Sequence, residues 1–246
     1  MRSVAIRDTD FPYYDGRPAA VGAGGWALLI ASLAMAFAAL ALIPLRGFPG
    51  SLLPPLIFAG LPLLTLAALV GRHWTALFRR VGWREAGLMA AFAVATMVAS
   101  LLAALLVRAL GSTAPNPVVD AMAAMSAGDF LRRLLPTLPQ LVGEELLTIL
   151  PFLALLWLAT RVLGFGRRAG ILLGLIGSSL IFAAAHLPTY DWHWAQCFGV
   201  IGTARLVLTL AYVWTRNLWV SAGAHILNDW TEFSLAFGIS HLPIGT

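Results

Sequence analysis

Long apolar stretches alternate with short polar segments along most of the chain. Each stretch is close to the ~20 residues that an α-helix needs to cross the hydrocarbon core of a bilayer. The pattern therefore predicts an all-α fold, a polytopic transmembrane helical bundle of about seven helices. The predicted membrane helices cover residues 26–45, 52–70, 86–107, 138–160, 169–187, 194–214 and 218–237.

The segment 111–136 interrupts this pattern because charged residues recur within it. Asp120, Asp129, Arg132 and Arg133 stand among alanines, methionines and leucines. Such a mixture suits an amphipathic helix that lies at the outer surface of the membrane. A short eighth membrane element is the alternative interpretation.

Composition agrees with a membrane protein and narrows the classes of function. Hydrophobic residues make up 60% of the chain and charged residues 11%, whereas soluble domains carry about a quarter charged residues. All 16 basic residues are arginines, and with 11 acidic residues they give a formal net charge of +5. In a membrane protein such an excess reports orientation rather than nucleic-acid binding. We therefore expect membrane lipid, and no nucleic acid, among the partners.

The arginines are divided unevenly between the two sides of the predicted bundle, eleven on the N-terminal side and four on the other. The positive-inside rule predicts a cytoplasmic N-terminal tail over residues 1–25 and a single transmembrane domain over residues 26–246, in the plasma (inner) membrane. The richer side holds Arg2, Arg7, Arg17, Arg72, Arg79, Arg80, Arg84, Arg161, Arg167, Arg168 and Arg216, and the poorer side holds Arg46, Arg108, Arg132 and Arg133.

Ionisable and polar groups inside the predicted spans carry the chemical information. An ionised side chain at the centre of a membrane helix costs about 2.5–3.5 kcal/mol on insertion scales, so each one needs a partner, a wet cavity or a function. The residues of this kind are Glu144 and Glu145 in the fourth span, His186 at the end of the fifth, Arg205 in the sixth, and His225, Asn228, Asp229 and Glu232 in the seventh.

The two adjacent glutamates predict a division of labour. Neighbouring residues of a helix point about 100° apart, so Glu144 and Glu145 do not face one point. One carboxylate can address a reaction centre while the other holds a neighbouring group. In a site of low dielectric a glutamate can act as a general base on water, and either glutamate with His186 would form such a pair.

The polar residues of the seventh span share one face of the helix. His225, Asn228, Asp229 and Glu232 fall at positions i, i+3, i+4 and i+7, so they form one stripe that must face protein or water. A carboxylate one turn from a histidine can fix the tautomer of the imidazole. Asp229 is expected to do this for His225.

Three short motifs in chain order resemble those of the CPBP family of intramembrane proteases, which includes CAAX-processing proteases and bacteriocin-associated Abi proteins. The family pattern is Glu-Glu-x-x-x-Arg, then Phe-x-x-x-His, then His-x-x-x-Asn/Asp. The resemblance covers residues 136–240. The matching positions are Glu144 and Glu145, Phe182 and His186, and His225 and Asp229.

The resemblance implies a bundle that encloses a cavity in which water is activated. Glu144 with His186 would handle the water, and Glu145 would organise the site. His225 with Asp229 would support the tetrahedral intermediate. This mechanism implies no certain cofactor, and a zinc ion held by His186, His225 and Glu144 is the alternative.

One position departs from the family pattern. Ile149 stands where the family has the arginine of its first motif, so the i,i+4 ion pair to Glu145 is absent. Arg205 could supply this charge from the sixth span. Glu145 and Glu232 are the two candidates for its partner.

The sequence therefore predicts an intramembrane peptidase that cleaves a membrane-embedded or lipid-proximal peptide or protein with activated water. The alternative is a non-catalytic relative that binds and regulates a membrane partner or an exported peptide. In that case the polar cluster would only hold the helices together. A transporter or proton relay would also use intramembrane ionisable groups, but the chain shows no repeated pair of interrupted spans.

Overall fold

The computed structural model describes residues 10–44, 47–111 and 113–242. Within these residues every regular element is a helix, which confirms the predicted all-α bundle. The end of the first predicted span, and Arg2, Arg7 and Arg46 of the orientation prediction, lie outside the described residues.

Six helical segments are long and apolar enough to cross a membrane. They contain α1 (Ala23–Leu42), α2 (Leu53–Val70) with the flanking turns η1 (Gly50–Leu52) and η2 (Gly71–Leu77), α3 (Trp83–Leu110), α5 (Ala127–Trp157) with η3 (Leu158–Val162), α6 (Arg167–Ala185), and α8 (Gly202–Thr215), which follows α7 (Trp194–Gln196) and η5 (Cys197–Ile201). These segments correspond to the first six predicted spans. The turn η4 (Leu187–Tyr190) follows α6.

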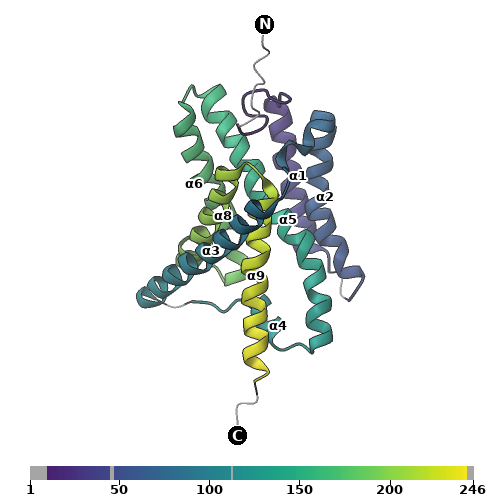
Figure 1. The fold of residues 1–246 in the computed structure, drawn as a ribbon, viewed down its shortest axis with the longest axis vertical. Helices are drawn as coiled ribbons and strands as arrows, with labels where there is room; N and C mark the ends of the chain where they lie inside the picture. The colour runs from purple at the N-terminus through teal and green to yellow at the C-terminus, as the bar shows by residue number, and fades with distance from the viewer. Residues whose placement is uncertain (1–9, 45–46, 112, 243–246) are drawn as a thin grey trace.

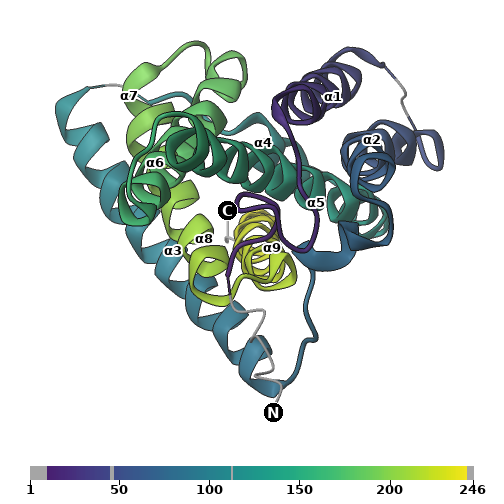
Figure 2. The same ribbon diagram turned by 90° about the horizontal axis from the view of Figure 1, so that it is seen from above.

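The seventh predicted span is found as α9 (Leu218–Ser240), a helix of 23 residues. It is long enough to cross a bilayer at about 1.5 Å per residue. Because of its polar stripe, α9 is not among the six segments that are apolar enough to count as membrane spans. Helix α9 instead lies inside the bundle, where α3, α5 and α8 pack around it (Figure 2).

The segment 111–136 does not form one amphipathic helix. A short helix, α4 (Pro117–Ala123), is followed directly by the first turns of α5. The start of α5 is set by Ser126, whose hydroxyl accepts a hydrogen bond from the backbone N–H of Asp129 at 3.2 Å and donates to its carboxylate at 2.8 Å. The hydroxyl satisfies one free backbone donor of the first turn, and α5 then continues through Pro136 and Pro139.

Helix α5 forms the centre of the core. Of its most apolar window 67% is buried, against 17–39% in the other five spanning segments, whose outer faces carry exposed leucines and valines. Residues of α5 contact α1, α2, α6, α8 and α9. The glutamate pair on α5 is therefore held by the most constrained helix of the bundle.

The α2–α5 contact depends on a glycine. A Cβ atom added at Gly143 would lie 2.8 Å from Cγ of Phe58, whose ring is fully buried. The missing side chain lets the two helices approach closely next to Glu144. Small residues serve this purpose at membrane helix interfaces.

We expect Gly143→Ala to lower the free energy of unfolding by about 1–3 kcal/mol, because the methyl group overpacks the Phe58 ring. Chemical unfolding in detergent micelles measures this change. Gly60→Ala on α2 is the matched control, since no atom lies within 4 Å of its added Cβ. Equal effects of the two substitutions would contradict the proposed close contact.

Candidate active site

A buried ion pair joins α5 to α8. Nη2 of Arg205 donates to Oε1 of Glu145 at 2.7 Å, and both side chains are 0% exposed. The guanidinium also lies over the Phe182 ring of α6, 4.9 Å from its centroid. Of the two partners considered for Arg205, the structure selects Glu145. Glu232 makes no ion pair with it in the described part of the chain.

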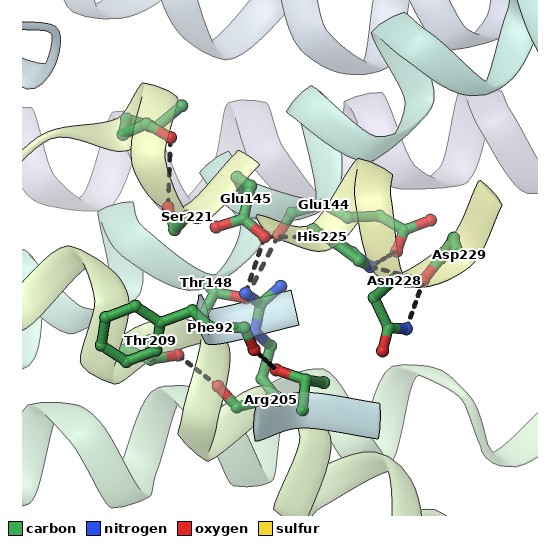
Figure 3. Close-up of polar contacts among 12 residues, drawn as sticks. Phe92, Glu144, Glu145, Thr148, Arg205, Thr209, Ser221, His225, Asn228 and Asp229 are labelled. Atoms are coloured by element: carbon green, nitrogen blue, oxygen red, sulfur yellow. Dashed lines mark hydrogen bonds and ion pairs between the residues drawn. The ribbon is translucent and has the colours of Figure 1, made fainter. Parts of the chain in front are cut away.

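The same carboxylate oxygen holds His225 of α9 (Figure 3). Nδ1 of His225 lies 2.9 Å from Oε1 of Glu145, so the ring donates through Nδ1 to the glutamate. This arrangement corrects the expectation that Asp229 fixes the tautomer. The Asp229 carboxylate instead faces the other ring nitrogen, with Oδ1 3.6 Å from Nε2.

Glu144 approaches the opposite edge of the same imidazole. Its Oε2 lies 3.8 Å from Nε2 of His225, while its Oε1 accepts a hydrogen bond from Nε2 of Gln140 at 3.1 Å. The two adjacent glutamates therefore reach the two different nitrogens of one ring. Sequence reasoning missed Gln140, although its position one helical turn before Glu144 is the spacing at which helical side chains meet.

Glu144 and Glu145 occupy different environments. The Glu145 side chain is 0% exposed and paired with Arg205. Glu144 is 13% exposed and, among the described residues, forms an ion pair with no side chain other than His225. Glu144 borders the cavity described below. Glu145 is thus suited to hold its neighbours, and Glu144 to meet a reactant.

His186 ends α6 and faces the same cavity. Its Nδ1 donates to the backbone carbonyl of Phe182 at 2.9 Å, and the two rings lie 4.5 Å apart between centroids. This hydrogen bond leaves Nε2 with a free lone pair. Among the described residues no hydrogen bond or ion pair joins His186 directly to Glu144.

The rest of the polar stripe on α9 also borders the cavity. Nδ2 of Asn228 donates to Oδ1 of Asp229 at 3.0 Å, and Glu232 lies one turn further along. Burial, followed by the charges of Glu232 and Asp229, raises the pKa of Tyr190 in η4. Tyr190 is therefore a neutral hydroxyl at physiological pH.

The cavity has a volume of about 640 Å³. Its wall comes from α3, α4, α5, α6, α8 and α9, together with η4, α7 and η5. Apolar side chains such as Leu101, Leu141 and Leu208 supply much of the lining, and the carboxylates and histidines of the centre form one polar region. A cavity of this size and lining accommodates a segment of peptide.

The ligand set suggested for zinc does not come together. In the described residues no group of three histidine, cysteine, aspartate or glutamate side chains is placed to hold a metal ion. Nδ1 of His186 is bonded to a carbonyl, and Nδ1 of His225 to Glu145. The residues present thus do not fit the zinc site considered from the sequence, which would have used Glu144 as its third ligand.

Together the fold and the centre define a class: a polytopic helical membrane protein with paired carboxylates and imidazoles around an intramembrane cavity. Residues 126–231 match the family model of type II CAAX prenyl endopeptidase Rce1-like proteins. This segment runs from the N-cap of α5 into α9 and contains Glu144, Glu145, His186, Arg205, His225 and Asp229, whereas Glu232 follows it directly. Over this segment the chain is similar to that protease family. Comparison with curated proteins and with solved structures finds no match.

Removing the positive charge of Arg205 leaves the buried Glu145 carboxylate without its cation. We expect Arg205→Met to lower the free energy of unfolding by about 3–5 kcal/mol, and Arg205→Met with Glu145→Gln to recover part of the loss. Thermal and chemical unfolding in detergent measure both. Arg132→Gln is the control, since its pair with Asp129 is exposed and is worth about 0–1 kcal/mol. An effect no larger than that control would contradict a structural ion pair.

Proposed function

We propose that the protein is an intramembrane endopeptidase that hydrolyses a peptide bond of a membrane-embedded or lipid-proximal substrate. The observation that carries this proposal is the position of Glu144, a cavity-facing carboxylate beside Nε2 of His225. The match of residues 126–231 to a protease family model supports the reaction class. The apolar cavity wall supports a substrate that is itself apolar or lipid-anchored.

Glu144 is the general base in this proposal. A water molecule between Glu144 and Nε2 of His186 loses a proton to the carboxylate and attacks the carbonyl carbon of the scissile bond. The C–N bond then breaks, and Glu144 returns the proton to the leaving amine nitrogen. One water molecule is consumed, and one carboxylic acid and one amine are formed.

His225 stabilises the charge that develops on the carbonyl oxygen. When the ring is protonated, Nδ1 donates to Glu145 and Nε2 has a proton to offer. Glu144 and Asp229 lie near Nε2 in the resting site, and the oxyanion replaces them as acceptor during the reaction. A donor held in place before the reaction is worth about 2.7–4 kcal/mol to the transition state.

Arg205 takes the place of the arginine of the first family motif in this proposal. Ile149, at the corresponding position, is fully buried in the apolar core and brings no charge. The guanidinium reaches Glu145 from α8 instead of from one turn along α5. The orienting charge is therefore present although the motif residue is not.

The position of the chain in the membrane is also part of the proposal. The arginine distribution supports a plasma-membrane protein with residues 10–22 on the cytoplasmic side and the C-terminal end of α9 outside. These two ends lie at opposite ends of the bundle (Figure 1).

We expect Glu144→Gln to reduce peptide hydrolysis by about 10²–10⁴-fold while the unfolding midpoint stays near that of the wild type, because the amide cannot accept the water proton. The assay uses protein in liposomes with a mixture of prenylated and unmodified hydrophobic peptides, and products are detected by mass spectrometry. Asp120→Asn, an exposed acid on α4, is the control. Equal product from Glu144→Gln would exclude this base, and no product from the wild type would favour a binding role.

Orientation is measured with single cysteines. Cys197 is fully buried, so it is replaced by serine, and cysteine is placed at the exposed positions Thr75 or Thr113. We expect a membrane-impermeant maleimide to label Thr113→Cys in intact cells and Thr75→Cys only after permeabilisation. The reverse pattern would overturn the proposed orientation.

A further inference from the structure

The cavity reaches only one end of the bundle. Its lining on α5 runs from Arg133 to Glu144 and does not reach the last third of that helix, and its lining on α9 runs from His225 to Leu235. The end of α6, the second half of α3, the first half of α8, and α4, η4, α7 and η5 supply the rest. All of these segments lie towards the C-terminal end of the bundle and α4, away from the N-terminus (Figure 1).

Polar side chains line the cavity at this end, namely Asn116, Arg133, Thr189, Gln196 and Glu232. Of these, Arg133, Thr189 and Glu232 are exposed. Hydrogen-bonding groups of both kinds suit water and a peptide backbone better than a lipid chain.

The opposite end is closed by residues 10–22. The Phe11 ring packs edge-on against Phe152 of α5, with centroids 5.2 Å apart, and lies 6.0 Å from Tyr212 of α8. All three side chains are at most 2% exposed. In the described part of the chain no residue of this segment, and none of α1 or α2, lines the cavity.

Phe11 closes the α5–α8 interface directly above the buried ion pair. Phe152 follows Glu145 by seven residues on α5, and Tyr212 follows Arg205 by seven residues on α8. Residues seven apart share a helix face about 10 Å apart along the axis. The aromatic trio therefore fills the same interface that holds the centre, two turns closer to the N-terminal end.

Polar contacts attach residues 10–22 to the neighbouring helix ends. Asp10 pairs with Arg167, and Arg161 donates to the backbone carbonyl of Asp15 at 2.8 Å. The buried hydroxyl of Tyr13 donates to the carbonyl of His73 in η2 at 2.8 Å. The segment thus links the ends of three separate spanning segments.

We propose that substrate reaches the site only from the end opposite residues 10–22, which is the outer face of the membrane. The substrate is then an exported or membrane-anchored peptide presented at the extracytoplasmic side. The substrate statement rests on the proposed peptidase activity. The direction of access rests on the cavity, on the closed end and on the arginine distribution. Residues 10–22 act as the cytoplasmic seal.

Access is measured by cysteine modification, which needs no hydrolysis. In the Cys197→Ser background, Ala204→Cys places a thiol in the cavity wall beside Arg205. We expect an anionic, impermeant methanethiosulfonate to modify it at least about tenfold faster in right-side-out than in inside-out membrane vesicles, because thiol reactivity follows exposure. Thr113→Cys and Thr75→Cys, measured in the same vesicles, report which face is outside.

Each outcome decides one part of the proposal. Equal rates from both faces, or no modification from either, would overturn one-sided access. Modification from the Thr113 face, with that face found in the cytoplasm, would overturn the extracytoplasmic substrate.

Phe11→Ala is expected to admit the reagent from the Thr75 face, and Phe11→Leu to admit less of it. If Phe11→Ala leaves the site closed on that side, residues 10–22 are not the seal. An inactive protein with one-sided labelling would refute the peptidase and leave the access route standing.

Discussion

The structure depends on one buried arrangement, in which Oε1 of Glu145 binds Arg205 and His225 at the same time. An uncompensated charge inside the bundle would be costly, so the three side chains constrain one another. They come from α5, α8 and α9, and the Phe182 ring under the guanidinium adds α6. The positions of four helices are thus tied to a single carboxylate. The reactive groups around it take their places from that constraint.

Two neighbouring residues of the same type acquire different roles from their surroundings. Glu145 is enclosed and neutralised by Arg205, whereas Glu144, about 100° further round α5, borders a cavity and has a hydrogen bond from Gln140. In the proposed mechanism the first holds the imidazole and the second acts on water. In the proposed access route, residues 10–22 close one end of the bundle, and the reacting side of the centre is reached from the other end.

Much of this could be predicted from the sequence because membrane helices are specified locally. The apolar stretches correctly predicted six membrane-spanning segments and the helix α9. The spacing of His225, Asn228, Asp229 and Glu232 placed these residues on one face of α9. The rotation of one helix against another is not a local property. Periodicity therefore did not decide that Glu145 rather than Asp229 meets Nδ1 of His225. It also did not place His186 outside direct contact with Glu144.

The boundary of α5 was missed for a different reason. A surface helix over residues 111–136 was expected to precede the fourth span, but tertiary packing tolerates Pro136 and Pro139 inside α5, and the Ser126 cap starts the helix earlier. Arg205 was recognised as needing an acid because a lone buried charge has no low-energy alternative. Its choice between Glu145 and Glu232 required the three-dimensional packing of α8 against α5.

The central claim is that the centre activates water, and isotope labelling tests it most directly. Hydrolysis of the liposomal peptide mixture is carried out in water enriched in oxygen-18, and the new carboxyl terminus is analysed by mass spectrometry. We expect one heavy oxygen in that carboxylate after a single turnover. Cleavage products without solvent oxygen, or peptides joined to another acceptor in place of water, would contradict a water-activating site.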